Sequence, residues 1–164
     1  MRKINIIYSG GIKTQEKYYQ DAIDEYTKRL SRDFKITHTE IKEESIPEKP
    51  GKSEIELCLK KEGEKILEKI CGNGNSFKIA LCIEGKKLSS EEFASLLYSE
   101  KAVNSQSVDF IVGSSHGLSG EVKKSADYLL SLSDMTFNHR LARVMLMEQI
   151  YRAYAIETGR KYHK

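Results

Sequence analysis

Long apolar runs are absent from this sequence of 164 residues. No stretch approaches the roughly 18 consecutive apolar residues that a membrane-spanning helix needs. The first residues, MRKINIIYSGG, are charged and strand-like, and they lack the apolar segment of a secretory signal peptide. We therefore expect a cytoplasmic protein with no membrane association. The length suits one domain with one sizeable core, so we predict a single domain over residues 1–164.

Cysteine and proline are also scarce. Cys58, Cys71 and Cys82 are odd in number and show no C-x-x-C spacing. Each lies in or beside an apolar run, so we expect buried, reduced thiols and no metal site. Both prolines, Pro47 and Pro50, fall in the segment KEESIPEKPGK, which predicts one long loop.

Strand-like and helix-like segments alternate along the rest of the chain. Apolar and alternating patterns predict strands at 2–10, 34–41, 77–83, 108–113 and 127–133. Helical spacing and capping residues predict helices at 14–30, about 53–71, 89–98, after Ser119, and from the segment around His139 to Ile156. This alternation predicts an α/β fold, with a parallel sheet of about five strands and helices on both faces.

Positive charge is concentrated at the end of the chain. The net charge is only +3, but residues 138–164 contain six Lys and Arg residues against two Glu residues, so this segment holds the whole positive excess. A basic terminal segment suits contact with nucleic-acid phosphates. A solvated helix end with cations near its C-terminus is the alternative interpretation.

The strand ends are the places to search for a ligand site, because ligands of parallel α/β sheets bind at the carboxyl ends of the strands. These ends read YSGG, CIEGKK, VGSSHG and SLSDMTF. The segments SGGIKT and CGNGNS fail the spacing or the order of elements that nucleotide-binding motifs require.

A hydrolase motif is the sharper alternative. Gly113, Ser115 and Gly117 match G-x-S-x-G between a strand and a helix. Residues that could complete a triad follow in the hydrolase order: Asp127 or Asp134, then His139 or His163. The chain is short for such an enzyme, and a five-residue glycine pattern often occurs by chance. A flexible strand-to-helix turn, whose glycines tolerate positive φ and let a ligand approach the backbone, is the interpretation we favour.

Three segments indicate a family. FIVGSSHGLS, LSLSDMTFNHRLARVMLMEQIYRAYAIETG and the terminal YHK closely resemble the RlmH (YbeA-like) family of bacterial ribosomal RNA methyltransferases, in the SPOUT superfamily. The resemblance extends over the whole chain, including LKKEGEKIL and LCIEGKKLSSEEFA. It implies a homodimeric fold with a C-terminal trefoil knot. It also implies methyl transfer from S-adenosylmethionine to N3 of a pseudouridine in 23S rRNA of the large ribosomal subunit. A nonenzymatic ribosome-binding protein on the same scaffold remains an alternative.

The resemblance also implies roles for individual residues. The cofactor-binding residues would be Leu81, Gly113, Leu132, Ser133, Asp134, Met135, Thr136 and Phe137. The catalytic residues would be His139, Arg152, Tyr162 and His163, and the RNA-binding residues would be Arg140, Arg143, Arg160, Lys161 and Lys164. An apolar loop that contains Leu132, Met135 and Phe137 can form a slot for an adenine ring. The chain departs from the family pattern at Ser114, His116, Asn138 and Lys161.

The terminal helix is apolar on several sides, so we expect it to be buried on more than one of them. One side would pack on the sheet and another on the same helix of a second subunit, with Met147 and Ile150 facing the partner. Glu148 and Arg152 stand four residues apart, which predicts a local ion pair.

Overall fold

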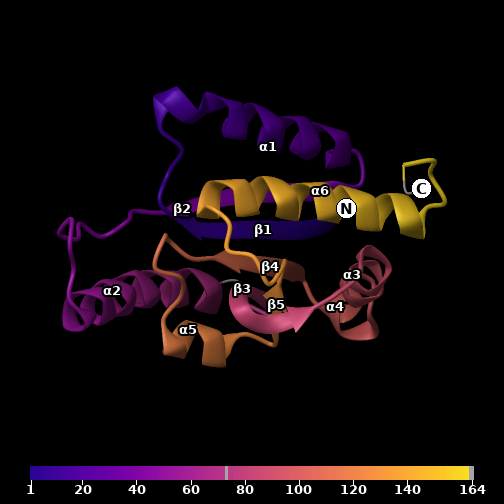
Figure 1. Cartoon of the computed structure of the whole chain (residues 1–164). Helices are drawn as coiled ribbons and strands as arrows, with labels where there is room; N and C mark the ends of the chain where they lie inside the picture. The colour runs from indigo at the N-terminus through magenta and orange to yellow at the C-terminus, as the bar shows by residue number, and fades with distance from the viewer. Residues whose placement is uncertain (73, 163–164) are drawn as a thin grey trace.

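Parallel strands flanked by helices form the framework of the protein (Figure 1). The structure, a computed structural model, describes residues 1–72 and 74–162. Within these residues the strands are β1 (Arg2–Ser9), β2 (Phe34–Ile41), β3 (Ser76–Lys87), β4 (Ser107–Val112) and β5 (Tyr128–Ser131). The helices are a 3-10 turn, η1 (Thr14–Glu16), and α1 (Lys17–Leu30), α2 (Lys52–Cys71), α3 (Ser90–Leu97), α4 (Glu100–Asn104), α5 (Gly120–Ser125) and α6 (His139–Glu157). The five strands pair in parallel in the order β2-β1-β4-β3-β5, which confirms the predicted fold class.

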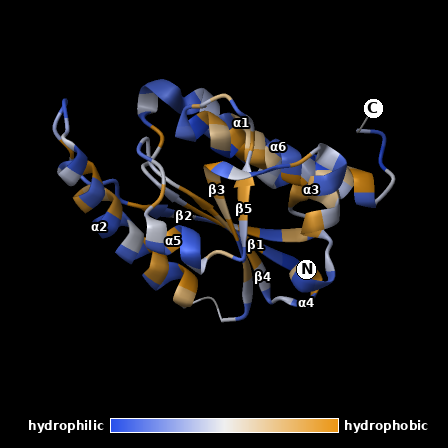
Figure 2. Ribbon diagram, turned by 60° about the horizontal axis from the view of Figure 1, so that its bottom comes forward, coloured by the Kyte–Doolittle hydropathy of each residue, from blue (hydrophilic) through white to orange (hydrophobic). Residues whose placement is uncertain are grey.

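The sheet is covered on both faces. Helices α1 and α6 lie on one face, and α2 and α5 lie on the other (Figure 1). Helix α3 packs beside α6 on the first of these faces. Successive side chains of β1 alternate between the two cores: Ile4 and Ile6 face α1 and α6, whereas Ile7 faces α2 and α5. The hydropathy colouring in Figure 2 shows the apolar sides of the helices turned towards the strands. Burial on both faces explains why the strands read as apolar runs.

Helix α6 is buried on more than one side, as predicted. It packs on the sheet and contacts both α1 and α3. Met147 and Ile150 are 0% exposed and belong to this core, so the prediction that they face a partner subunit was wrong. The partly exposed apolar side of the helix instead carries Leu141, Val144 and Met145.

Strand β3 is longer than the sequence predicted. Its pairing with β5 runs from Ile79 to Leu81, breaks, and resumes at Lys86. Gly85 lies against the β5 backbone at this break, where a Cβ atom would stand only 2.6 Å from the carbonyl carbon of Leu130. The missing side chain lets the two backbones approach, and residues 82–85 have no partner in the β3–β5 ladder.

Smaller differences concern a helix and the cysteines. Helix α4 was not predicted. Only Cys58 is buried; Cys71, at the last turn of α2, is exposed, and Cys82 is partly exposed. Ile70 beside Cys71 and Leu81 beside Cys82 pack in the core, whereas Ile83, on the other side of Cys82, is 64% exposed. Among the described helices, none is long and apolar enough to cross a membrane.

Candidate active site

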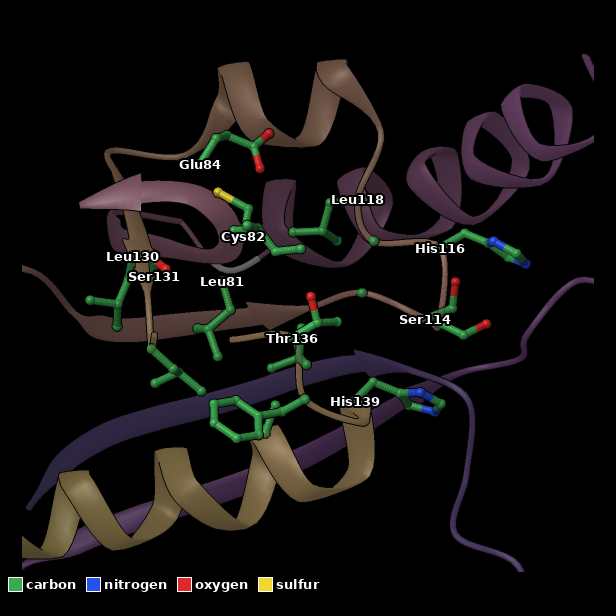
Figure 3. Close-up of a pocket in the computed structure, with 18 of the residues that line it drawn as sticks. Leu81, Cys82, Glu84, Ser114, His116, Leu118, Leu130, Ser131, Thr136 and His139 are labelled. Atoms are coloured by element: carbon green, nitrogen blue, oxygen red, sulfur yellow. The ribbon is translucent and has the colours of Figure 1, made fainter. Parts of the chain in front are cut away.

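A cavity of about 270 Å³ lies at the ends of β4 and β5 and beside the part of β3 where its pairing with β5 breaks (Figure 3). Seven of the eight predicted cofactor residues line it: Leu81, Gly113, Leu132, Ser133, Met135, Thr136 and Phe137. Leu118 and Leu130 add to the apolar wall. Segments that are far apart in the sequence therefore converge at the strand ends, as the sheet topology requires.

Asp134, the eighth predicted residue, points away from the cavity. Its side chain is 83% exposed and forms an ion pair with Lys87 at 2.6 Å. Hydrogen bonds on either side fold this loop: Ser131 Oγ donates to the carbonyl oxygen of Ser133 at 3.0 Å, and the Met135 N–H donates to Ser133 Oγ at 3.1 Å. The loop thus directs Asp134 to solvent, while Ser133 and Met135 line the cavity, Met135 at its open edge with 71% of its surface exposed.

The GSSHG segment is a closed turn. The Gly117 N–H donates to the carbonyl oxygen of Ser114 at 3.0 Å, and Gly117 has φ +89°, which favours glycine. A Cβ atom on Gly113 would overlap the carbonyl group of Gly117. The turn itself therefore requires both glycines. The approach of a ligand to their backbone stays a prediction, and both residues line the cavity.

The hydrolase alternative lacks a triad among the described residues. Ser115 is exposed on the turn, and no residue other than glycine has a positive φ in the described chain, unlike the strained serine of a nucleophile elbow. Asp127 accepts bonds from the Lys78 backbone and from Lys101, both at 2.8 Å, and Asp134 pairs with Lys87. No hydrogen bond joins either aspartate to a histidine in the described chain.

Glu84 and Lys123 also line the cavity and were missed from the sequence. Their side chains form a hydrogen-bonded ion pair, in which Lys123 donates to the Glu84 carboxylate. This hydrogen bond lowers the pKa of the Glu84 carboxyl. Figure 3 shows Glu84 at one end of the cavity and Ser114 and His139 at the other. The position of Glu84 in CIEGKK, just after an apolar strand, was the available signal.

His139 begins α6 and borders the cavity. Its Nε2 atom is buried and has no hydrogen-bond partner among the described residues. Burial lowers the pKa of the imidazole, and the positive charges of Arg140 and Arg143 lower it further. His139 is therefore neutral near pH 7, with a nitrogen that can accept a proton.

The two arginines that follow His139 hold the loop after β1. Arg140 donates from Nε to the carbonyl oxygen of Gly11 at 2.9 Å, and the same nitrogen lies 3.1 Å from the Glu16 carboxylate. Arg143 is only 2% exposed and donates to the carbonyl oxygen of Gly10 at 3.2 Å. This buried position gives Arg143 a structural role in place of the phosphate contact that the sequence suggested.

The remaining predicted catalytic residues meet at the other end of α6. Arg152 pairs with Glu148 at 2.6 Å, which confirms the predicted ion pair. The Tyr162 hydroxyl donates to the same carboxylate at 3.2 Å, and the Arg152 guanidinium lies 4.9 Å from the centre of the Tyr162 ring. A hydrogen bond with Tyr26, burial and the Glu148 charge raise the pKa of Tyr162.

Within one chain, His139 at the start of α6 is too far from Arg152 and Tyr162, near its end, to act at the same site. Arg152 stands thirteen positions after His139 in α6, which corresponds to about 20 Å of helix. Arg160 and Lys161 are exposed beyond the helix, and the Arg160 guanidinium lies 4.5 Å from the centre of the Tyr154 ring. His163 and Lys164 lie outside the described residues.

Comparison with known proteins identifies relatives that are methyltransferases. The family model described as "Predicted SPOUT methyltransferase" matches residues 2–163. The chain is 48% identical to "Ribosomal RNA large subunit methyltransferase H" of Clostridioides difficile (strain 630) over 98% of this chain and 99% of that protein. It is 44% identical to the protein of the same name from Oenococcus oeni (strain ATCC BAA-331 / PSU-1) over the full length of both. A solved structure, that of a probable methylase family protein from Haemophilus influenzae Rd KW20, matches with a TM-score of 0.53 at 12% identity, covering 99% of this chain and 70% of that one, and shares the fold.

Proposed function

This chain belongs to the ribosomal RNA large subunit methyltransferase H family of SPOUT methyltransferases, and we propose that it methylates N3 of a pseudouridine in 23S rRNA with S-adenosylmethionine as methyl donor. The observation that carries the proposal is the convergence of the predicted cofactor residues around one cavity at the strand ends. The proposal also includes a cytoplasmic location, a single domain over residues 1–164 and a C-terminal trefoil knot.

The cavity fits the proposed cofactor. The apolar side chains of Leu81, Leu132 and Phe137 suit an adenine ring, and strand-end backbone groups can read its polar edge. The Glu84 carboxylate can accept hydrogen bonds from ribose hydroxyls. When bound, S-adenosylmethionine supplies a methyl group that its positively charged sulfur has already activated.

The protein then has to orient the base and accept the proton that its N3 atom loses. The neutral Nε2 of His139 can take the N3 proton that the base loses as its nitrogen acquires the methyl group. Arg140 lies beside it and favours a developing negative charge on the base. No metal ion enters this scheme.

A second copy of the chain would complete the site. Arg152 lies about 20 Å along α6 from His139, and the Tyr162 ring lies against Arg152. The partly exposed apolar side of this helix carries Leu141, Val144 and Met145. Pairing of two α6 helices in a symmetric homodimer covers this side and brings the tail of one subunit to the cavity of the other. Arg160, Lys161 and Lys164 would then contact RNA phosphates.

Calorimetry with S-adenosylmethionine and methyl transfer to ribosomes test the proposal. Thr136→Tyr should fill the cavity and weaken cofactor binding by about tenfold or more, since Thr136 lines the cavity but is exposed enough to tolerate bulk. Asp134→Tyr adds the same bulk on the solvent side of the same loop and should bind normally. Absence of binding to the native protein, or binding without methyl transfer to pseudouridine-containing ribosomes, would refute the assignment.

A further inference from the structure

A second hollow opens beside the cofactor cavity. It has a volume of about 530 Å³, and we call it the polar chamber; its polar walls come from Lys13, Glu43, Ser114, Asn138, His139 and Arg140. It shares Ser114, Thr136, Phe137 and His139 with the cofactor cavity. A molecule in the polar chamber would therefore lie next to a group bound in the cavity.

Two buried polar atoms of the chamber have no hydrogen-bond partner among the described residues. One is the hydroxyl of Ser114, a residue that is only 5% exposed, and the other is Nε2 of His139. Buried polar atoms are rarely left unpaired, because each costs the free energy of its lost hydration. Their position in the wall of a hollow indicates a polar ligand that supplies the missing bonds.

Glu43 converges on the same place. A Cβ atom built on Gly10 would lie 2.8 Å from Glu43 Oε2 and 3.4 Å from His139 Nε2, so the carboxylate and the imidazole approach one point above Gly10. The next residue is firmly held, because the Glu44 N–H donates to Oε1 of the buried Glu62 at 2.9 Å. The Glu44 carboxylate pairs with Lys65, which leaves Glu43 to face the chamber.

We propose that the polar chamber receives the acceptor base and that Glu43 distinguishes pseudouridine from uridine; this inference rests on the proposed function. Pseudouridine is joined to its ribose through carbon, so its ring carries an N1–H that uridine lacks. A carboxylate accepts this hydrogen bond, while the Ser114 hydroxyl can donate to a ring carbonyl and His139 faces the N3–H. Uridine would place a C–H group against Glu43 and leave the carboxylate without a partner.

The experiment measures kcat/KM on ribosomes that carry either pseudouridine or uridine at the target position. The native enzyme should prefer pseudouridine by about tenfold or more, as expected for a charge-assisted hydrogen bond. Glu43→Ala should reduce this ratio by about tenfold, chiefly through slower reaction of pseudouridine, with unchanged S-adenosylmethionine affinity and melting temperature. Glu43→Gln keeps one acceptor oxygen and should give an intermediate ratio.

Glu44→Ala is the matched control, because its carboxylate pairs with Lys65 outside the chamber, and it should retain the native ratio. A native enzyme that methylates neither ribosome would refute the proposed function itself. A native enzyme that methylates both equally would overturn only the further inference. So would a Glu43→Ala enzyme that keeps the native ratio or slows on both substrates alike.

Discussion

The guanidinium carbon of Arg143 lies 3.7 Å from the centre of the Tyr8 ring, inside the protein. The same guanidinium donates to the carbonyl oxygen of Gly10, so one side chain of α6 holds both the end of β1 and the loop that follows it. Gly10 is also the point on which Glu43 and His139 converge. The shape of the candidate site thus depends on a buried contact between the first strand and the last helix.

Arg143→Lys should weaken this contact. Lysine lacks the planar group that stacks on Tyr8 while it donates to Gly10. We expect the free energy of unfolding in urea to fall by about 1–3 kcal/mol. Arg160→Lys is the control: Arg160 lies over the Tyr154 ring but is exposed, and its substitution should change stability by less than about 0.5 kcal/mol. Equal effects of the two substitutions would contradict the structural role of Arg143.

Gly113→Ala tests the closed turn. The added methyl group would overlap the Gly117 carbonyl, so the strand end must shift, and we expect a loss of about 3 kcal/mol or failure to fold. Gly120→Ala, where a Cβ atom meets no atom within 4 Å, should be nearly neutral. Thermal melting of both variants provides the comparison, and similar melting temperatures would mean that the turn adjusts freely.

The proposed dimer makes a prediction about the exposed side of α6. Met145→Glu should give a folded monomer in sedimentation, because a charge on the partly exposed apolar side opposes burial against a partner. Leu57→Glu, on the exposed surface of α2, should remain a dimer. Met147→Glu should instead unfold the protein, since that side chain is in the core. A native protein that sediments as a monomer at micromolar concentration would exclude the dimer.

The pKa of His139 sets the acid side of the predicted pH profile. Because burial and two arginines hold this pKa below its ordinary value of 6.5, His139 keeps its accepting nitrogen at pH 7 and loses it only as the pH falls through the lowered pKa. Single-turnover methyl transfer should therefore lose rate on acidification only below about pH 6.5. Arg140→Gln removes one positive charge, so the acid limb should move to higher pH, whereas Arg160→Gln should leave it in place. An acid limb that does not move would argue against His139 as proton acceptor.

The tail can be tested by deletion of residues 162–164. Tyr162 contributes contacts at the surface end of α6, so its loss should leave folding and S-adenosylmethionine affinity nearly unchanged. Methyl transfer should fall by orders of magnitude if the tail completes the site of the other subunit. Charge removal at Arg160 and Lys161 should instead weaken ribosome binding and its salt dependence, by about one unit of log–log slope per lost phosphate contact. Normal methyl transfer by the truncated protein would show that the tail is an ordinary solvated chain end with no part in the reaction.

Periodicity and capping residues were sufficient to predict the strands, most helices and the parallel sheet. They could not orient α6, because a helix that is apolar nearly all round has no polar side to mark its phase, and so Met147 and Ile150 were assigned to the wrong surface. Strand β3 was predicted too short because its last part, EGKK, is polar and pairs with β5 only at the sheet edge.

The cavity could be located from the strand ends, but its residues came from family resemblance. The sequence could not show why residue 113 must be glycine. A side chain there is excluded by the carbonyl group of Gly117, which comes close only when the turn is closed. Arg143 was interpreted as a surface cation, because its neighbours in the sequence do not indicate that it is buried beside the ring of Tyr8. Glu43 was overlooked for the same reason: only the folded chain places it beside His139.

The position of α6 between α1 and α3 has a consequence for synthesis of the protein. The core on this face joins Ile4 and Ile6 of β1 to Ile150 and Tyr154 of α6, which are made much later. While the chain is growing, the apolar faces of α1 and of the sheet have no covering helix. A nascent chain should therefore stay incompletely folded, and open to chaperones, until α6 has been made and has left the ribosome.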